Sequence, residues 1–244
     1  MTTASPLTPK RKRGRPRNYG GSAEDQSSEI LDIAIKVFAK QSYQATTMSQ
    51  IAEAAGYNQS SLYYWYKNKE ELLEAILKKS ETSLRVSSRI VTLPGDKLVQ
   101  LYAVIYSDVL MMCESPFDFY DLEEVAHSQN GYLQSFFDTY QQLIDNIVQI
   151  IQQGMKLHEF VNVDPRTVAL SALALNEGLQ HRYHINRRYS VSSNRMLGDD
   201  AQLLFCSEKA LADHAASTVI VQLAPKCVPA EVRRQAIENN WIEE

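Results

Sequence analysis

Cysteine is scarce in this 244-residue sequence, and the three cysteines, at positions 113, 206 and 227, lie far apart. An odd number without a C-x-x-C pair supports neither a disulfide framework nor a cysteine zinc site. No run approaches the roughly 18 uninterrupted apolar residues of a membrane span. The N-terminus also lacks the apolar core of a secretory signal. These absences predict a reduced, cytoplasmic protein without membrane contact.

Apolar residues make up 44% of the chain and charged residues 22%, which is the balance of a soluble protein with a buried core. The net charge is −4, but the charges are unevenly distributed: residues 1–20 hold six basic residues and no acidic one, whereas residues 80–244 hold 13 basic and 21 acidic residues. A basic arm on an acidic body points to a polyanion bound at one end of the molecule. Residues 1–22 lack any hydrophobic period, so we expect them to be disordered.

From residue 27 onward, apolar residues recur at helical spacing, and no run alternates as a strand would. This pattern predicts an all-α fold. The first helix should end near residues 40–41. Further helices are expected at residues 97–113, 132–155, 165–187, 201–223 and 229–239.

Three helix-start signals follow one another closely after the first helix. Thr47 with Gln50 is a capping box, and Gly56 suits the left-handed position at the end of the helix that follows. Asn58 is a second N-cap, and residues 68–71 contain a third capping signal. Two short helices joined by three residues are what a helix-turn-helix requires.

The second of these short helices, residues 59–65, contains no charged residue. Leu62, Trp65 and Tyr66 can pack inward, which leaves amide and hydroxyl groups on the other side. Such groups reach base edges and phosphate oxygens in a major groove, and the free N–H groups at a helix start favour phosphate. The alternative is that the four consecutive aromatics are core, but they spread around the helix axis and cannot all point inward.

Residues 43–73 resemble the DNA-binding signature of the TetR family of bacterial transcription regulators. The matching features are Thr-Thr before the second helix, Ile-Ala-x-x-Ala-Gly through it, Leu-Tyr-x-x-aromatic in the third, and Lys-x-Glu-Leu opening the fourth. The resemblance extends over residues 27–78. Two positions depart from it: Ser42 stands where Gly is usual, and Tyr66 where Phe is usual.

The resemblance implies a three-helix DNA-binding domain at residues 23–78 and a helical effector-binding and dimerisation domain at residues 79–244. The function it implies is that of a ligand-responsive repressor that binds a palindromic operator as a homodimer, although activation would use the same parts. By the same resemblance Thr47 caps the second helix and touches phosphate, and Tyr63 and Lys69 hold phosphates. The residues facing bases or the nearby backbone are Gln59, Ser60, Ser61 and Tyr64.

The basic arm contains Arg13-Gly-Arg15-Pro-Arg17, which is similar to an AT-hook. In such an element the glycine lets the backbone approach the floor of a narrow A·T-rich minor groove, and the arginines enter its negative potential. The alternative is a solvated tail that adds only nonspecific attraction.

Two of the expected body helices are candidates for the homodimer interface. Residues 167–187 contain small residues that permit close helix approach, and residues 201–223 carry a leucine and alanine stripe. The alternative for either helix is a stripe that packs within the monomer.

The sequence gives little indication of which ligand the body binds. Aromatic and acidic residues lie near each other along the body, which is compatible with a cationic or amphipathic ligand. The alternative is that the aromatics are core and the acids a solvated face. The candidate ligand contacts are Phe117, Tyr120, Asp121, Glu124, Phe137, Glu177 and His181.

Glu177, His181 and His184 share one helical face and could present three metal ligands, although such a stripe is more often a polar surface. We predict no metal and no cofactor. Nothing resembles a nucleophile–base motif or a phosphate-cradling glycine loop, so we predict that the protein is not an enzyme. Two alternatives remain: an architectural DNA-binding protein without effector, and a metal-dependent enzyme with a DNA-binding appendage.

Overall fold

The computed structural model describes residues 23–41, 43–79, 82–128, 134–188, 204–205 and 207–243. Within these ranges every regular element is a helix, so the predicted all-α class is confirmed. No helix in the described ranges is long and apolar enough to cross a membrane. The arginines of the basic arm, Arg13, Arg15 and Arg17, lie outside the described residues, as does Ser42.

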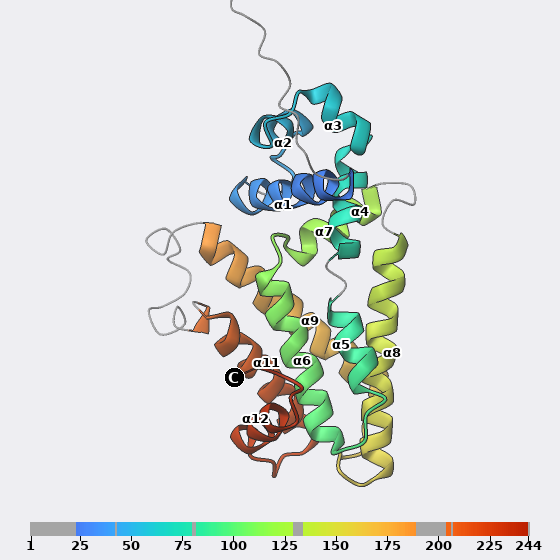
Figure 1. Ribbon diagram of the computed structural model, residues 1–244. Helices are drawn as coiled ribbons and strands as arrows, with labels where there is room; N and C mark the ends of the chain where they lie inside the picture. Colours follow the sequence, from blue (N-terminus) through green and yellow to red (C-terminus); the bar gives the residue numbers. More distant parts are fainter. Residues whose placement is uncertain are drawn as a thin grey trace, which may run out of the picture.

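A small helical domain lies at one end of the molecule, drawn at the top of Figure 1. It consists of α1 (Ala23–Gln41), α2 (Met48–Ala54), α3 (Gln59–Trp65) and the start of α4 (Lys69–Lys79). The four helices share one core because each turns an apolar stripe inward, as the spacing predicts. Fully buried members of this core are Ile30, Ala34, Phe38, Ile51, Leu62, Leu72, Leu73 and Ile76.

The described residues that follow form a longer helical body around a central helix. That body consists of α5 (Thr82–Ile90), α6 (Lys97–Glu114), α7 (Phe119–Ser128), α8 (Gln134–Lys156), α9 (Pro165–Arg188), α11 (Glu208–Leu223) and α12 (Pro229–Glu238). Helix α6 packs against five of the others, α5, α8, α9, α11 and α12, and runs through the middle of the body in Figure 1. Its sequence is apolar around most of the circumference, which suits a helix surrounded by neighbours.

The structure differs from the sequence-based expectations at three elements. Helices α5 and α7 are present although no helix was expected there, since each is too short for its apolar period to stand out. The helix expected at residues 201–223 begins at Glu208 instead. Its start is fixed by Ser207, whose hydroxyl accepts a hydrogen bond from Ala210 N at 3.2 Å. That N-cap sets the boundary more strongly than the apolar residues before it.

Candidate nucleic-acid interface

The start of α2 is held by the predicted capping box. Thr47 Oγ1 accepts from Gln50 N at 3.3 Å, and Thr47 N donates to Gln50 Oε1 at 2.8 Å. Gly56 follows α2 at φ +70°, a backbone conformation that favours glycine. Thr47 is exposed, so its hydroxyl and the first N–H groups of α2 lie at the surface of the domain.

The start of α3 is held by a single side-chain oxygen. Asn58 Oδ1 accepts from Ser61 N at 2.7 Å, from Ser60 Oγ at 2.7 Å and from Ser61 Oγ at 2.8 Å. Both serine hydroxyls therefore donate into the cap and turn acceptor lone pairs outward. The sequence identified Asn58 as a cap, but gave no sign that it also orients the two serines expected at the DNA.

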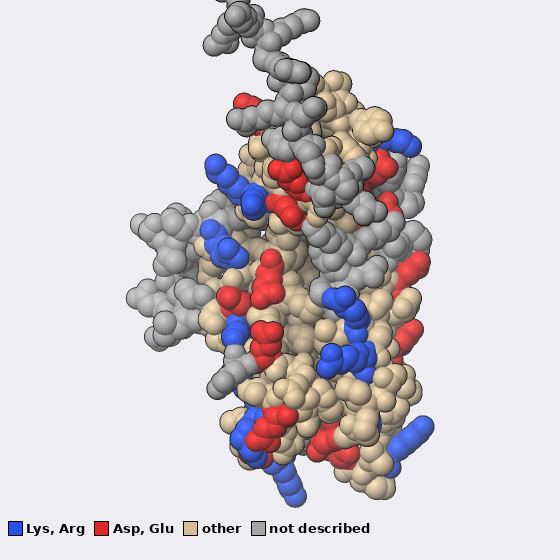
Figure 2. Space-filling view, in the orientation of Figure 1, with Lys and Arg blue, Asp and Glu red and all other residues tan. Residues whose placement is uncertain are grey.

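The outer side of α3 is uncharged and exposed. Leu62 and Tyr66 are buried, whereas the Tyr63 side chain is 43% exposed and that of Tyr64 is 83% exposed. Gln59 and Ser60 lie on the same open side. In Figure 2 the tip formed by α3 is tan, which fits the absence of charged residues from this helix. Tyr64 is thus almost twice as exposed as Tyr63, its neighbour on this side of the helix.

Lys69, expected at a phosphate, is held inside the domain by the turn that precedes α2. Its Nζ donates to Tyr43 O at 2.9 Å and to Thr46 O at 3.0 Å, and lies 4.1 Å from the centre of the Tyr43 ring. Burial lowers the pKa of Lys69, while the charge of Glu70 opposes that shift. Two of the three ammonium hydrogens are used in these bonds, so Lys69 joins the start of α4 to the turn before α2.

Tyr66, which stands where the resembling family usually has Phe, uses its extra hydroxyl. The Tyr66 and Ser27 hydroxyl oxygens lie 2.7 Å apart, so one donates to the other. This bond ties the end of α3 to α1. Ser27 was not predicted to have a role, and the tyrosine in place of phenylalanine was the only signal that could have found it.

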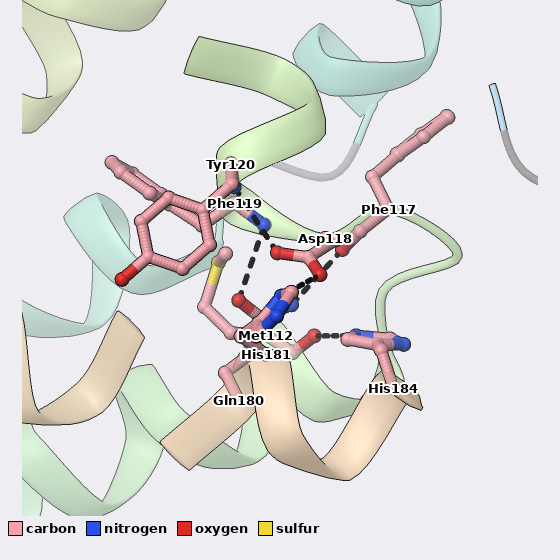
Figure 3. A network of polar contacts seen from close by, with 8 residues as sticks. All are labelled: Met112, Phe117, Asp118, Phe119, Tyr120, Gln180, His181 and His184. Carbon is pink, nitrogen blue, oxygen red and sulfur yellow. Dashed lines mark hydrogen bonds and ion pairs between the residues drawn. The ribbon is translucent and has the colours of Figure 1, made fainter. Parts of the chain in front are cut away.

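A loop between α6 and α7 connects the body to this domain. Phe117 lies in the core of the small domain, with its ring centre 5.3 Å from that of Phe38. The loop backbone is held from the other side by Gln180 of α9, as Figure 3 shows. Gln180 Oε1 accepts from Phe119 N at 3.1 Å, and its Nε2 donates to Phe117 O at 3.2 Å.

Two histidines of α9 make further contacts nearby, His181 with the loop and His184 with the last turns of α6. His181 Nδ1 lies 2.5 Å from Asp118 Oδ2, and His184 Nε2 lies 3.0 Å from Met112 O (Figure 3). Glu177, the third member of the stripe considered as a metal site, accepts a hydrogen bond from Tyr140 instead. The three side chains thus have three different partners. In the described part of the chain no three His, Cys, Asp or Glu side chains are grouped to hold a metal ion.

The candidate ligand residues divide into two groups in the structure. Phe117 is part of the core of the small domain, and Phe137 packs against that core. Tyr120 and His181 lie together, with ring centres 5.1 Å apart, on the same side of the body as Glu177. The other two candidates, Asp121 and Glu124, are on α7; Asp121 is half-buried, and the Glu124 side chain lies outside the described residues.

Residues 30–76 match the family model described as bacterial regulatory proteins, tetR family. A similar curated protein is the HTH-type transcriptional repressor KstR2 of Rhodococcus jostii, which is 43% identical over 63 residues, 26% of this chain and 31% of that protein. The alignments with the curated relatives that rank first cover 29%, 62% and 34% of the relatives' own lengths.

Solved structures of similar fold cover most of the chain. AmtR of Mycobacterium smegmatis matches with a TM-score of 0.65 and 17% identity, over 94% of this chain and 99% of that one. AibR in complex with isovaleryl coenzyme A and operator DNA matches with a TM-score of 0.59 and 20% identity, over 82% and 98%. Because the sequence identities are this low, these structural matches show a common fold and nothing more. The helix-turn-helix segment at residues 30–76 is that of the tetR family of bacterial regulatory proteins.

Proposed function

We propose that this protein is a sequence-specific, DNA-binding transcriptional regulator that acts as a ligand-responsive repressor on a palindromic operator. The observation that carries the proposal is the uncharged, exposed side of α3, formed by Gln59, Ser60, Tyr63 and Tyr64 at the tip of a helix-turn-helix. Amide and hydroxyl groups on an otherwise neutral helix discriminate base edges in the major groove. Such a protein acts on DNA in the cytoplasm and catalyses no reaction.

The remaining DNA contacts surround this helix. Thr47 and the start of α2 would receive a phosphate, and Ser61 would accept from the DNA backbone or a base edge beside it. Lys69 retains one ammonium hydrogen for a phosphate. Arg13, Arg15 and Arg17 would enter a neighbouring minor groove. Residues 23–78 form the DNA-binding domain in this proposal, and residues 79–244 the effector and dimerisation domain.

The dimer would form through the outer sides of α9 and α11, which pack against each other in the monomer. On α9, Ala169 and Ala172 face the core, while Leu170, Ala174 and Gly178 are on the open side. On α11 the open side includes His214 and Val221. The small and apolar residues on the open side of α9, together with Val221 of α11, suit a four-helix interface with a second copy.

The α6–α7 loop would carry the effector signal. Gln180 and His181 fix this loop to α9, and Phe117 fixes it to the DNA-binding domain. A ligand that binds one arrangement of the loop better than another would change the spacing of the two recognition helices and hence operator affinity.

Selection of duplexes from a random library by the purified full chain, at near-physiological salt, tests this function. We expect a palindromic consensus, because a two-fold dimer reads two half-sites. Recovery of A·T-rich DNA without a palindrome would instead favour an architectural protein whose basic arm does the recognising. Recovery of no sequence at all would reject operator binding.

A further inference from the structure

Two carboxyl groups, one buried and one half-buried, have no basic partner among the described residues of the body. Asp108 of α6 is buried, and its Oδ2 accepts from Asn176 Nδ2 at 2.8 Å. Glu177, the next residue of α9, is half-buried and accepts from Tyr140 Oη at 2.5 Å. Among the described residues no lysine or arginine forms an ion pair with either carboxyl group.

The surroundings make the negative charge of both groups costly. Burial raises the pKa of Asp108, although hydrogen bonds from Asn176 and Ser83 oppose the shift. Burial likewise raises the pKa of Glu177; the hydrogen bond from Tyr140 opposes this, and the negative charges of Glu123 and Asp108 add to it. A buried carboxylate without a counter-ion destabilises the native state. A cation bound between these groups would remove that cost.

A buried hydrogen-bond acceptor beside Asp108 also lacks a donor. Asn176 is 2% exposed, and its Nδ2 is used by Asp108. Its Oδ1, on the same amide group, is buried and has no partner within the described ranges. Buried side-chain oxygens are rarely left without a hydrogen bond. The amide oxygen therefore needs an N–H or O–H that the described chain does not supply.

Aromatic rings continue from Glu177 toward the surface. The ring centre of Tyr140 is 5.4 Å from that of Phe119, and that of Phe119 is 6.2 Å from that of Tyr120. Tyr120 is 42% exposed, so this row of rings opens to solvent at the start of α7. Aromatic faces attract cations and also take up the apolar part of an amphipathic ligand.

We propose that the effector is an organic ammonium ion with an aromatic or apolar body. Its N–H groups would bind Asp108, Glu177 and the free oxygen of Asn176, and its apolar part would lie against the row of aromatic rings. This inference rests on the proposed function, because it names the ligand class of the effector domain. It separates this chain from AibR, whose ligand isovaleryl coenzyme A carries phosphates that the two carboxylates would repel.

The position of the site explains how the ligand would be sensed. Phe119 and Tyr120 are the first residues of α7, directly after the loop that carries Phe117 and Asp118. Movement of these rings on ligand binding would act on a loop that is fixed at both ends. The ligand thus contacts the element that joins the body to the DNA-binding domain.

Calorimetric titration of the full chain with three indole probes of one skeleton tests the proposal. Tryptamine is a cation, tryptophol is neutral and indole-3-propionate is an anion, so only the charge and the polar head differ. We expect tryptamine to bind about tenfold more tightly than tryptophol, and indole-3-propionate and isovaleryl coenzyme A to bind more weakly than either.

A charge-neutral variant locates the site. Glu177→Gln keeps an acceptor for Tyr140 and removes only the charge, so tryptamine affinity should fall about tenfold while tryptophol affinity stays unchanged. The matched control Asp145→Asn removes a charge from a side chain that is 58% exposed on α8, and should bind like the parent. Thermal unfolding of both variants confirms that they fold.

Equal affinity for the three indoles, tighter binding of isovaleryl coenzyme A, an unaffected Glu177→Gln variant, or no binding up to ~10 mM tryptamine would each overturn the proposal. The selection of duplexes uses no ligand. A palindromic consensus together with a failed titration would therefore reject the ammonium effector and leave the regulator intact.

Discussion

At the scale of single residues, the exposed hydroxyl of Tyr64 is the clearest candidate for base recognition. The side chain is 83% exposed, and its ring packs edge-on against Trp65 with centres 5.4 Å apart, which limits its motion. In the proposed function this side chain contacts DNA.

Tyr64→Ala should reduce discrimination between operator and random DNA by about 1–3 kcal/mol, because a base contact stabilises only the correct sequence. Fluorescence anisotropy with both duplexes measures the difference. Tyr64→Phe, which loses only the hydroxyl, tells whether the hydroxyl or the ring is read. Equal losses on both duplexes would show that Tyr64 contributes only nonspecific affinity.

Asp108 makes a prediction about the pH dependence of stability. Burial raises the pKa of this carboxyl group in the folded state, so at pH values between the unfolded and the folded pKa the native protein binds more protons than the unfolded chain. The contribution of Asp108 to stability is therefore complete below the ordinary aspartate pKa and is lost as the pH rises through the folded-state pKa.

Asp108→Asn removes this charge while keeping an acceptor for Asn176. The variant should gain about 1 kcal/mol in unfolding free energy at neutral pH, and its stability should fall less between pH 4 and pH 7 than that of the parent. Urea unfolding at a series of pH values checks both. If the unfolding free energy of the variant changed with pH as that of the parent does, ionisation of Asp108 would carry no cost to stability.

At the scale of elements, α9 holds the α6–α7 loop, a role that the sequence pattern did not predict. The Glu177–His181–His184 stripe was identified from its spacing, but spacing alone does not say which neighbour a helix faces. The structure sets its C-terminal turns against the α6–α7 loop, where Gln180 binds two backbone groups at once. Gln180 was missed because a lone glutamine in a helix carries no pattern.

Gln180→Met tests this contact with a side chain of similar shape. The change leaves Phe119 N–H and Phe117 C=O buried without partners, so unfolding free energy should fall by about 2–4 kcal/mol. Gln152→Met, at an exposed position of α8, is the matched control and should change stability little. Chemical denaturation compares the two, and equal stability would show that the loop is held by other contacts.

At the scale of the whole molecule, the proposed dimer depends on the outer side of α9. Ala174→Glu should convert dimer to monomer by placing a charge, and its symmetry copy, in the interface, at a cost of several kcal/mol. Ala230→Glu adds the same charge at an exposed position of α12 and should leave the dimer intact. Sedimentation velocity distinguishes the two states. A dimer that survives Ala174→Glu would place the interface elsewhere.

The sequence by itself determined the features that depend on neighbouring residues. Thr47, Asn58 and Gly56 gave the boundaries of α2 and α3 correctly because capping and left-handed turns involve residues only a few positions apart. The apolar stripes gave the all-α class for the same reason. The spacing of residues along the short helix α3 also predicted which of its side chains face the core and which face solvent.

Tertiary structure decided everything that joins distant segments. Whether Lys69 faces a phosphate or the carbonyls of Tyr43 and Thr46 depends on how α4 meets the turn before α2. Phe117 lies in the core of the other domain, and Asp108 meets Asn176 across two helices, because packing brings together residues that no local period connects. Tyr120 and Glu177 were candidates from the sequence, but their grouping with Asp108, Asn176 and Tyr140 depends on how α6, α7, α8 and α9 pack together.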